Sequence, residues 1–425
     1  MVPEVWTLWA DKLRAALCVC VTVVLCLVGG LAVQAQGPSP GAEPGTQPES
    51  RQEGDGATGP VAHGGSSEKR LTGEAGGEQE AGTEALLGFY VPLEWFVVPI
   101  MGYTPDTSVA LATVGIARFR FAGSSEESRP STLASLLTWT FKNQLLVRVG
   151  PQIYMDNEQW YFRGEVNYED WPELFFGVGP KASRDDQEKL ERRSLRVQGD
   201  LRYALYKRNL YLGLFGQHVQ TEIPVKEPGG LLDQQLVVGS EGGTVSGIGP
   251  SLVWDTRDSD VFARRGQFLR FQTIFYRRDF GGDFDHDVIS IDARTFTEVA
   301  PDHILAFQVL GRLSSGEVPF FNMALLGGVS QMRGFLEGRF RDNHMLVGQA
   351  EYRSPYIWRL SFVGFASAGQ VARRVDEFEL NSVKLSGGGG VRFAVNRKEG
   401  INMRADFGFA QDEGFGAYVA FIEAF

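Results

Sequence analysis

Polar and apolar positions alternate with a period of two along most of the chain. In residues 160–169 the even-numbered positions are apolar, aromatic or glycine, whereas the odd-numbered positions carry two glutamates, an arginine, an asparagine and a tyrosine. The same pattern recurs in residues 195–203, 289–294 and 401–407. Successive side chains of a β-strand point to opposite faces, so each segment has one polar and one apolar face. A soluble sandwich could show one such strand, but a polar face that recurs with charges of both signs favours a polar lumen and a lipid-facing exterior.

The number of alternating runs sets the size of the predicted barrel. About fifteen runs can be found, and a bacterial single-chain barrel has an even number of strands, so we expect 16, with 14 as the alternative. The missing strand is expected near residues 174–179 or within residues 86–100. Residues 86–103 are rich in aromatic and apolar side chains and are interpreted as a segment that enters or plugs the base of the barrel. The predicted fold is therefore all-β, a transmembrane antiparallel β-barrel that begins with a strand at residues 108–121.

Insert lengths distinguish the two rims of this barrel. The charged inserts at residues 181–193 and 221–242 are long and are expected to form loops on one rim. The turn at residues 207–209 is short and is expected on the other rim. Glycines 387–390 are expected to allow the strong coiling that barrel closure requires.

The N-terminal residues contain the only long apolar run. Lys12 and Arg14 precede the uncharged residues 15–33, and small residues stand just before Gln36. This pattern is typical of a secretory signal peptide, so residues 1–35 are predicted to be removed after Sec-type export, with an uncleaved anchor helix as the alternative. All three cysteines lie in this run, so a chain that starts at Gln36 would contain no disulfide and no thiolate metal site.

Composition separates the next segment from the barrel. Residues 36–85 are rich in Gly, Pro, Glu, Ser and Gln and have almost no large apolar side chains, so they cannot bury enough surface to offset the entropy of ordering. We therefore predict a disordered linker at residues 36–85 and a barrel at residues 86–425. The formal net charge of −11 argues against a nucleic-acid partner, which would require a basic patch.

One long polar insert combines glycines with an arginine. Arg333 lies between Gly327-Gly328 and Gly334-Phe335, and an alternating strand follows from Met345. In that strand Glu351 is on the polar face, so an arginine at the tip of an inward-folded loop could pair with an acidic barrel wall.

At this point the sequence resembles the BamA/TamA family of outer-membrane proteins, in which an R-G-F loop tip reaches into the lumen and docks on its wall. The resemblance implies that Arg333, Gly334 and Phe335 form the docking tip and that Glu351 is a partner. The family carries F-x-D-x-G on the next strand, whereas this chain has Ser367 in place of the aspartate, so Glu351 is expected to be the only charged partner left. The family also carries POTRA modules before the barrel, and residues 36–85 could not form one.

Two further motifs resemble this family. Asp255, Arg257 and Asp258, with Gly266 after them, resemble its D-x-R-D strand end, although alternating charge at a strand end is also an ordinary solvated rim. The final residues 414–425 alternate and end in Phe421 and Phe425, which resembles the recognition strand of outer-membrane barrels. Glu423 interrupts that pattern at a position where an apolar residue is usual.

Motifs for catalysis and metal binding are missing from the sequence. It contains no G-x-S-x-G, C-x-x-C or H-E-x-x-H, so we expect no catalytic residues, no cofactor and no metal. A barrel hydrolase would need a serine and a histidine paired on neighbouring strands, and His218 is interpreted as isolated.

The resemblance implies an integral protein of the bacterial outer membrane that transports or inserts protein or lipid. The alternative is a passive channel or structural barrel that has lost the assembly role. Expected partners are the lipid bilayer, the barrel-assembly machinery during biogenesis, and a periplasmic protein that replaces the POTRA modules.

Overall fold

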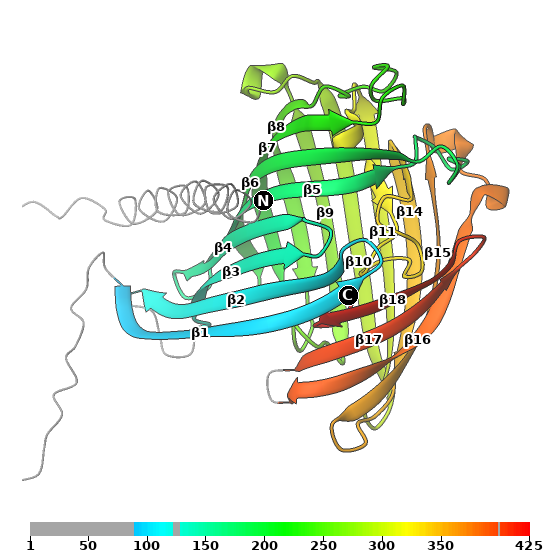
Figure 1. The fold of residues 1–425 in the computed structure, drawn as a ribbon. Coiled ribbons are helices and arrows are strands. Elements are labelled where there is room, and N and C mark those ends of the chain that lie inside the picture. The colour runs from blue at the N-terminus through cyan, green and yellow to red at the C-terminus, as the bar shows by residue number, and fades with distance from the viewer. Residues whose placement is uncertain (1–88, 122–127, 398–399) are drawn as a thin grey trace, which may run out of the picture.

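The chain folds into one closed antiparallel β-barrel of 16 strands (Figure 1). The computed structural model describes residues 89–121, 128–397 and 400–425. The barrel strands are β1 (Phe89–Thr104), β2 (Ser108–Phe121), β3 (Ser131–Thr140), β4 (Leu145–Met155), β5 (Trp160–Phe175), β6 (Glu188–Tyr206), β7 (Leu210–Lys226), β8 (Gly243–Asp255), β9 (Gly266–Tyr276), β10 (His286–Ala300), β11 (His303–Gly316), β14 (His344–Arg353), β15 (Leu360–Ala372), β16 (Lys384–Asn396), β17 (Ile401–Ala410) and β18 (Gly414–Phe421).

Each strand pairs with its neighbours in sequence, and β1 closes the barrel by meeting β18. The predicted fold class and the count of 16 are therefore confirmed. The interpretation of residues 86–103 as a plug is wrong, because Phe89–Thr104 is the first strand and pairs with β2 along its length. The expectation that the missing strand lies within residues 86–100 is therefore confirmed, and the alternative near residues 174–179 is wrong, because residues 174–175 are the end of β5. The predicted linker and signal peptide lie outside the described residues.

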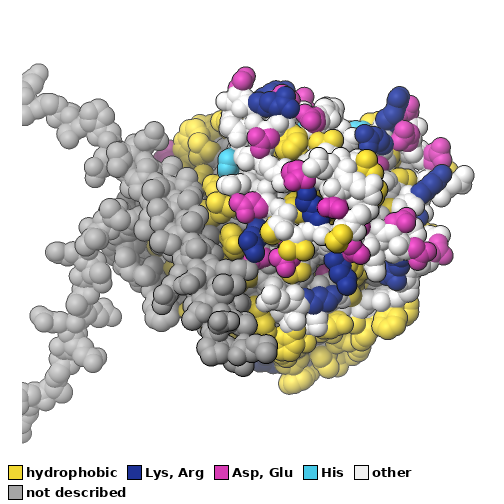
Figure 2. Space-filling view, turned by 45° about the horizontal axis from the view of Figure 1, so that its top comes forward, with side chains coloured by type: hydrophobic (Ala, Val, Ile, Leu, Met, Phe, Trp, Pro, Cys, Tyr) yellow, Lys and Arg dark blue, Asp and Glu magenta, His cyan; other side chains and the backbone are white. Residues whose placement is uncertain are grey.

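The two faces of the wall differ in polarity as the alternation predicts. On β14, Val347, Gln349, Glu351 and Arg353 face inward and are buried, whereas Leu346 and Tyr352 face outward and are exposed. Figure 2 shows charged side chains gathered over the upper loops and hydrophobic side chains around the lower flank. No helix of the described residues is both long and apolar enough to span a membrane.

The longest loops, which follow β5, β7, β11 and β15, lie on one rim, and the short turns after β4, β6 and β10 lie on the opposite rim, near the C-terminal end. The predicted loops are shorter than expected, because β6 begins at Glu188 and β7 continues to Lys226. Both strands extend beyond the alternating core because their charged residues pair across the strands, as in the ion pair of Arg193 with Asp170. The tight turn at residues 207–209 joins β6 to β7, with positive φ at Lys207 and Arg208.

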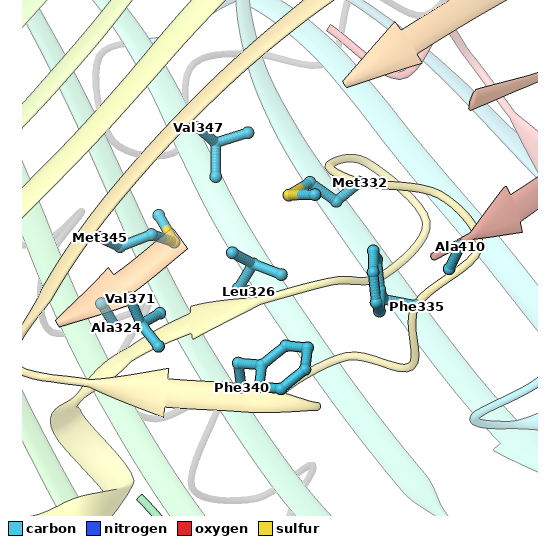
Figure 3. Close-up of a cluster of buried hydrophobic side chains, with 9 residues drawn as sticks. All are labelled: Ala324, Leu326, Met332, Phe335, Phe340, Met345, Val347, Val371 and Ala410. Atoms are coloured by element: carbon cyan, nitrogen blue, oxygen red, sulfur yellow. The ribbon is translucent and has the colours of Figure 1, made fainter. Parts of the chain in front are cut away.

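An inward loop, residues 317–343, connects β11 to β14 and fills part of the lumen. It contains the short helix η2 (Phe320–Asn322) and a two-stranded sheet of β12 (Ala324–Leu326) and β13 (Phe340–Asp342). A buried apolar cluster fixes the loop to the inner wall (Figure 3). Its members are Ala324, Leu326, Met332, Phe335 and Phe340 of the loop, together with Met345, Val347, Val371 and Ala410 of the wall.

The seam between β1 and β18 is the least paired junction of the barrel. A single residue pair is aligned there, Tyr103 with Val419. Every other neighbouring pair of barrel strands is aligned over at least seven residue pairs, the number found between β8 and β9. Gly102 lies so close to β18 that a Cβ would stand 2.9 Å from the carbonyl oxygen of Val419.

Candidate functional site in the barrel lumen

The tip of the inward loop is a tight turn that presents one arginine. The main-chain N–H of Phe335 donates to the carbonyl oxygen of Met332 at 3.2 Å, and Met332 and Gly334 have φ of 48° and 118°. Only glycine adopts the second value without strain, so Gly334 has a conformational reason to stand there. Arg333 between them is completely buried.

Arg333 makes two ion pairs with two different strands of the inner wall. Its Nη2 lies 2.6 Å from Glu351 Oε2 on β14, and its Nη1 lies 2.8 Å from Asp406 Oδ2 on β17. Its guanidinium also stacks on the ring of Phe365, with Cζ 3.5 Å from the ring centroid. A buried guanidinium needs such complete pairing, because removing one partner of a buried pair costs roughly 3–5 kcal/mol.

Further arginines extend these contacts into a charged network. Arg353 binds Glu351 at 2.9 Å, and Arg404 binds Asp406 at 2.8 Å. Arg392 lies between the two carboxylates, 2.5 Å from Asp406 and 3.8 Å from Glu351. We define the loop-tip network as four arginines and three carboxylates: Arg333, Arg353, Arg392, Arg404, Glu351, Asp406 and Glu423.

Glycines provide the space that this network occupies. A Cβ on Gly390 would overlap Asp406 Oδ1, and a Cβ on Gly408 would stand 2.6 Å from the main-chain carbon of Arg333. Gly390 belongs to the glycine run predicted to serve strand coiling, and here it leaves room for a carboxylate. The loop tip is also tied to β18, because the N–H of Gly334 donates to the hydroxyl of Tyr418 at 2.8 Å.

The prediction that Glu351 is the only charged partner of Arg333 is wrong. Asp406 supplies the second carboxylate from β17, two strands away from Ser367 in the wall. Ser367 faces the lumen, but its hydroxyl contacts Gln349 Oε1 at 3.5 Å instead of Arg333. The chain therefore keeps two carboxylates on the loop-tip arginine even though the predicted position carries a serine.

The C-terminal residues leave the wall, which corrects the prediction for the last strand. β18 ends at Phe421, and Ile422 has a φ of 65°, so the chain turns away from the strand there. Phe425 is buried against Ala263, Phe296 and Ala306, and its main-chain oxygen accepts from Arg353 Nη2 at 3.0 Å.

The position of Glu423 follows from this inward turn. Its Oε2 lies 2.7 Å from Arg392 Nε, and its Oε1 accepts from Asn402 at 2.9 Å. A carboxylate that would be out of place on a lipid-facing strand is thus a member of the loop-tip network.

The strand-end motif forms the turn between β8 and β9. Arg257 forms a bidentate pair with Asp255, at 2.9 and 2.7 Å, and its guanidinium stacks on the Phe268 ring. Asp258 Oδ1 accepts the N–H of Arg264 at 2.9 Å, which closes the turn. Gly266 has a φ of 107°. These residues hold the turn and do not contact Arg333.

A second contact joins the inward loop to the first hairpin. The N–H of Glu337 donates to Asp106 Oδ1 at 3.0 Å, and Asp106 lies in the turn between β1 and β2. Burial raises the pKa of this half-buried carboxyl to about 6, although the hydrogen bond from Glu337 acts in the opposite direction. The loop therefore touches both sides of the β1–β18 seam, through Asp106 on one side and Tyr418 on the other.

The interpretation of His218 as an isolated residue is wrong, because its side chain contacts a serine. Its Nδ1 lies 2.7 Å from Ser246 Oγ on the neighbouring strand β8, and the two residues are register partners. His218 is exposed, and Ser246 lies on the same outward face as the exposed Ile248. Among the described residues no third side chain orients the imidazole, so the pair lacks the arrangement of a catalytic triad. The described part of the chain also contains no group of three His, Cys, Asp or Glu residues suited to a metal ion.

Comparison with known proteins agrees with the barrel fold. Residues 137–413, more than half of the chain, match the Omp85 superfamily domain. The chain belongs to the Omp85 superfamily. No curated protein matches its sequence.

Solved structures of this fold are similar to the Omp85 barrel described here at low sequence identity. BamA from Haemophilus ducreyi, in a form that lacks POTRA domains 1–3, superposes with a TM-score of 0.52 and 12% identity, covering 78% of this chain and 71% of that chain. CdiB from Escherichia coli superposes with a TM-score of 0.53 and 11% identity, covering 78% of this chain and 64% of that chain. CdiB from Acinetobacter baumannii superposes with a TM-score of 0.52 and 12% identity, covering 77% of this chain and 59% of that chain. The resemblance to BamA/TamA barrels is therefore confirmed at the level of family and fold.

Proposed function

We propose that this Omp85 barrel acts in the outer membrane, where it transports or inserts protein or lipid after Sec-type export. The observation that carries the proposal is the β1–β18 seam, with its single aligned pair of Tyr103 and Val419. A strand edge with few partners opens at the lowest cost and leaves unpaired N–H and C=O groups that another chain can bind. Such an opening would connect the polar lumen with the lipid phase.

The contacts of the inward loop support a role for this seam. The N–H of Gly334 donates to Tyr418 of β18, and the N–H of Glu337 donates to Asp106 beside β1. One loop therefore contacts both sides of the β1–β18 seam. The loop-tip network fixes the same loop to β14, β16 and β17. Release of the loop would free β18 without disturbing the well-paired wall from β2 to β11.

Covalent closure of the seam tests this proposal. Tyr103→Cys with Val419→Cys places two thiols on register partners, and the three native cysteines all lie within residues 15–33. The matched control places Thr295→Cys with Phe307→Cys across the well-paired β10 and β11. Both variants are expressed in a strain depleted of the native chain, and the protein and lipid content of the outer membrane is measured with and without reductant.

The proposal predicts that the oxidised seam variant fails to restore the protein and lipid content of the outer membrane and that reductant recovers its activity. The control variant should be active in both states. Full activity of the oxidised seam variant, or an unchanged membrane after depletion, would contradict the proposal and favour a passive channel or structural barrel.

Partners follow from this proposal. The barrel-assembly machinery would fold the chain during biogenesis, and a periplasmic protein would supply the function that POTRA modules have in relatives. Crosslinking through the turn that contains Asp258, on the rim of the C-terminal end, tests the second partner. Recovery of no periplasmic protein by such crosslinking would argue against it.

A further inference from the structure

One part of the lumen wall, away from the loop-tip network, carries more arginines than carboxylates. The residues project inward from β5, β6, β9 and β11. We define the lumen arginine patch as Arg163, Arg202 and Arg270, which surround Asp200, together with the neighbouring pair Arg196 and Arg312.

Asp200 is already occupied by its neighbours. Arg202 binds it through two nitrogens at 2.9 and 2.5 Å, and Ser251 donates to its second oxygen at 3.0 Å. Gly213 makes this possible, because a Cβ there would stand 2.5 Å from Ser251 Oγ. Arg270 reaches the same carboxylate only at 3.9 Å, so it is weakly paired.

The remaining arginines of the patch have no carboxylate partner among the residues that the structure describes. Arg163 is the register partner of Asp200, yet it is exposed and forms no ion pair with any described residue. Arg312 donates to the carbonyl oxygen of Asn322 at 2.8 Å, which leaves its charge unbalanced. The Nε atoms of Arg196, Arg270 and Arg312 are buried without a hydrogen-bond partner.

Nearby carboxylates are used by other arginines. Asp292, the register partner of Arg270, is bound by Arg294 at 2.9 and 2.6 Å and by Gln308 at 2.8 Å. Glu169, on the strand next to Arg196, is bound by Arg192 at 3.1 Å. The patch therefore has five cations and one anion, whereas the loop-tip network has four cations and three anions.

We propose that the lumen arginine patch binds an oxyanion of the phosphate type. A concentration of like charge against a low-dielectric wall attracts counter-ions from the lumen. Guanidinium groups match the oxygens of phosphate through two parallel N–H bonds. Anion-selective membrane pores use arginine in the same manner.

Calorimetric titration of the purified full-length barrel with inorganic pyrophosphate at low salt tests this proposal. The native protein should bind pyrophosphate saturably, and Arg163→Gln with Arg270→Gln should weaken the affinity at least tenfold. Arg163→Lys with Arg270→Lys keeps the charge and should lose no more than a few-fold. Arg374→Gln, on an exposed loop outside the patch, is the control and should leave the affinity unchanged.

Folding of each variant is checked by heat-modifiable gel migration. If the double glutamine variant does not fold, Arg163→Gln alone serves, because this exposed side chain forms no ion pair within the described part of the chain. Its affinity should fall several-fold. Absence of saturable binding to the native barrel would overturn the proposal. Equal affinities of the native protein and a folded glutamine variant would overturn it as well.

Discussion

Removal of Arg333 and its partners probes the docked state of the inward loop. Arg333→Ala removes two ion pairs and the contact with Phe365, but it leaves every remaining carboxylate of the loop-tip network paired. Glu351→Gln keeps the loop tip and deprives three arginines of a shared carboxylate. The two substitutions therefore act on the same contact from opposite sides.

The expected magnitudes follow from burial and charge balance. Breaking a buried pair from one side costs roughly 3–5 kcal/mol, and we expect Glu351→Gln to lie in this range because it raises the excess of positive charge. Arg333→Ala lowers that excess, so its cost in the free energy of unfolding should be somewhat smaller, about 2–4 kcal/mol. In the double variant the contact is already lost, and the coupling energy should be about 0.5–3 kcal/mol.

A double-mutant cycle on the barrel in detergent micelles measures this coupling through urea-induced unfolding. Arg374 and Asp376 form a matched control, because they pair at 2.9 Å on an exposed loop and their removal should leave the midpoint unchanged. Losses for Arg333→Ala and Glu351→Gln that add within about 0.5 kcal/mol would mean that the two side chains do not interact, and the docked loop would be refuted.

Gly408→Ala should destabilise the barrel by about 1–3 kcal/mol, because its Cβ would meet the Arg333 main chain, whereas Gly348→Ala has open space around it and should be neutral in the same unfolding assay. Because the folded pKa of Asp106 is raised from 3.8 to about 6, its stabilising contribution is full below 3.8 and is lost as the pH rises through about 6. The melting temperature should therefore fall more between about pH 4 and pH 7 in the native protein than in Asp106→Asn, and an equal fall would contradict the assignment. Deletion of residues 36–85 should leave heat-modifiable migration unchanged, since the segment has few large apolar residues; loss of the shifted band would show that it contributes structure.

The barrel fold could be predicted from the sequence because the alternation of polar and apolar positions is a local property of each strand. Each of the segments at residues 160–169, 195–203 and 401–407 shows its two faces without knowledge of its neighbours, and an even strand number then leads to 16. The first strand could be placed only as one of two alternatives, because the alternation of polar and apolar positions is weak there. Val97 and Val98 are both exposed, so neighbouring positions on β1 do not differ in polarity as they do elsewhere.

The loop-tip network was only half predictable. Glu351 could be placed on the inner face from its own strand, but the pairing of Arg333 with Asp406 depends on where a long loop ends in three dimensions. A signal was present, because Arg404 and Asp406 are two inward-facing charges on one strand. Local patterns could not show that the second carboxylate comes from β17, whereas β15 contributes the ring of Phe365 to the loop tip.

A residue that departs from the alternating pattern can indicate that the chain has left the strand. Glu423 did not suit a lipid-facing strand, and its ion pair with Arg392 shows that the chain has already turned inward at that point. The same holds for His218, whose contact with Ser246 follows from the register of β7 and β8 and from no property of either segment alone.

Hydrogen exchange of the barrel in lipid nanodiscs tests the weak seam most directly, because amide protection reports which strands open without global unfolding. The account predicts that the amides of β18 exchange markedly faster than those of β10 and β11, and that Arg333→Ala accelerates β18 further while leaving β10 and β11 unchanged. Protection of β18 equal to that of β10 and β11 would contradict a seam that opens between β1 and β18.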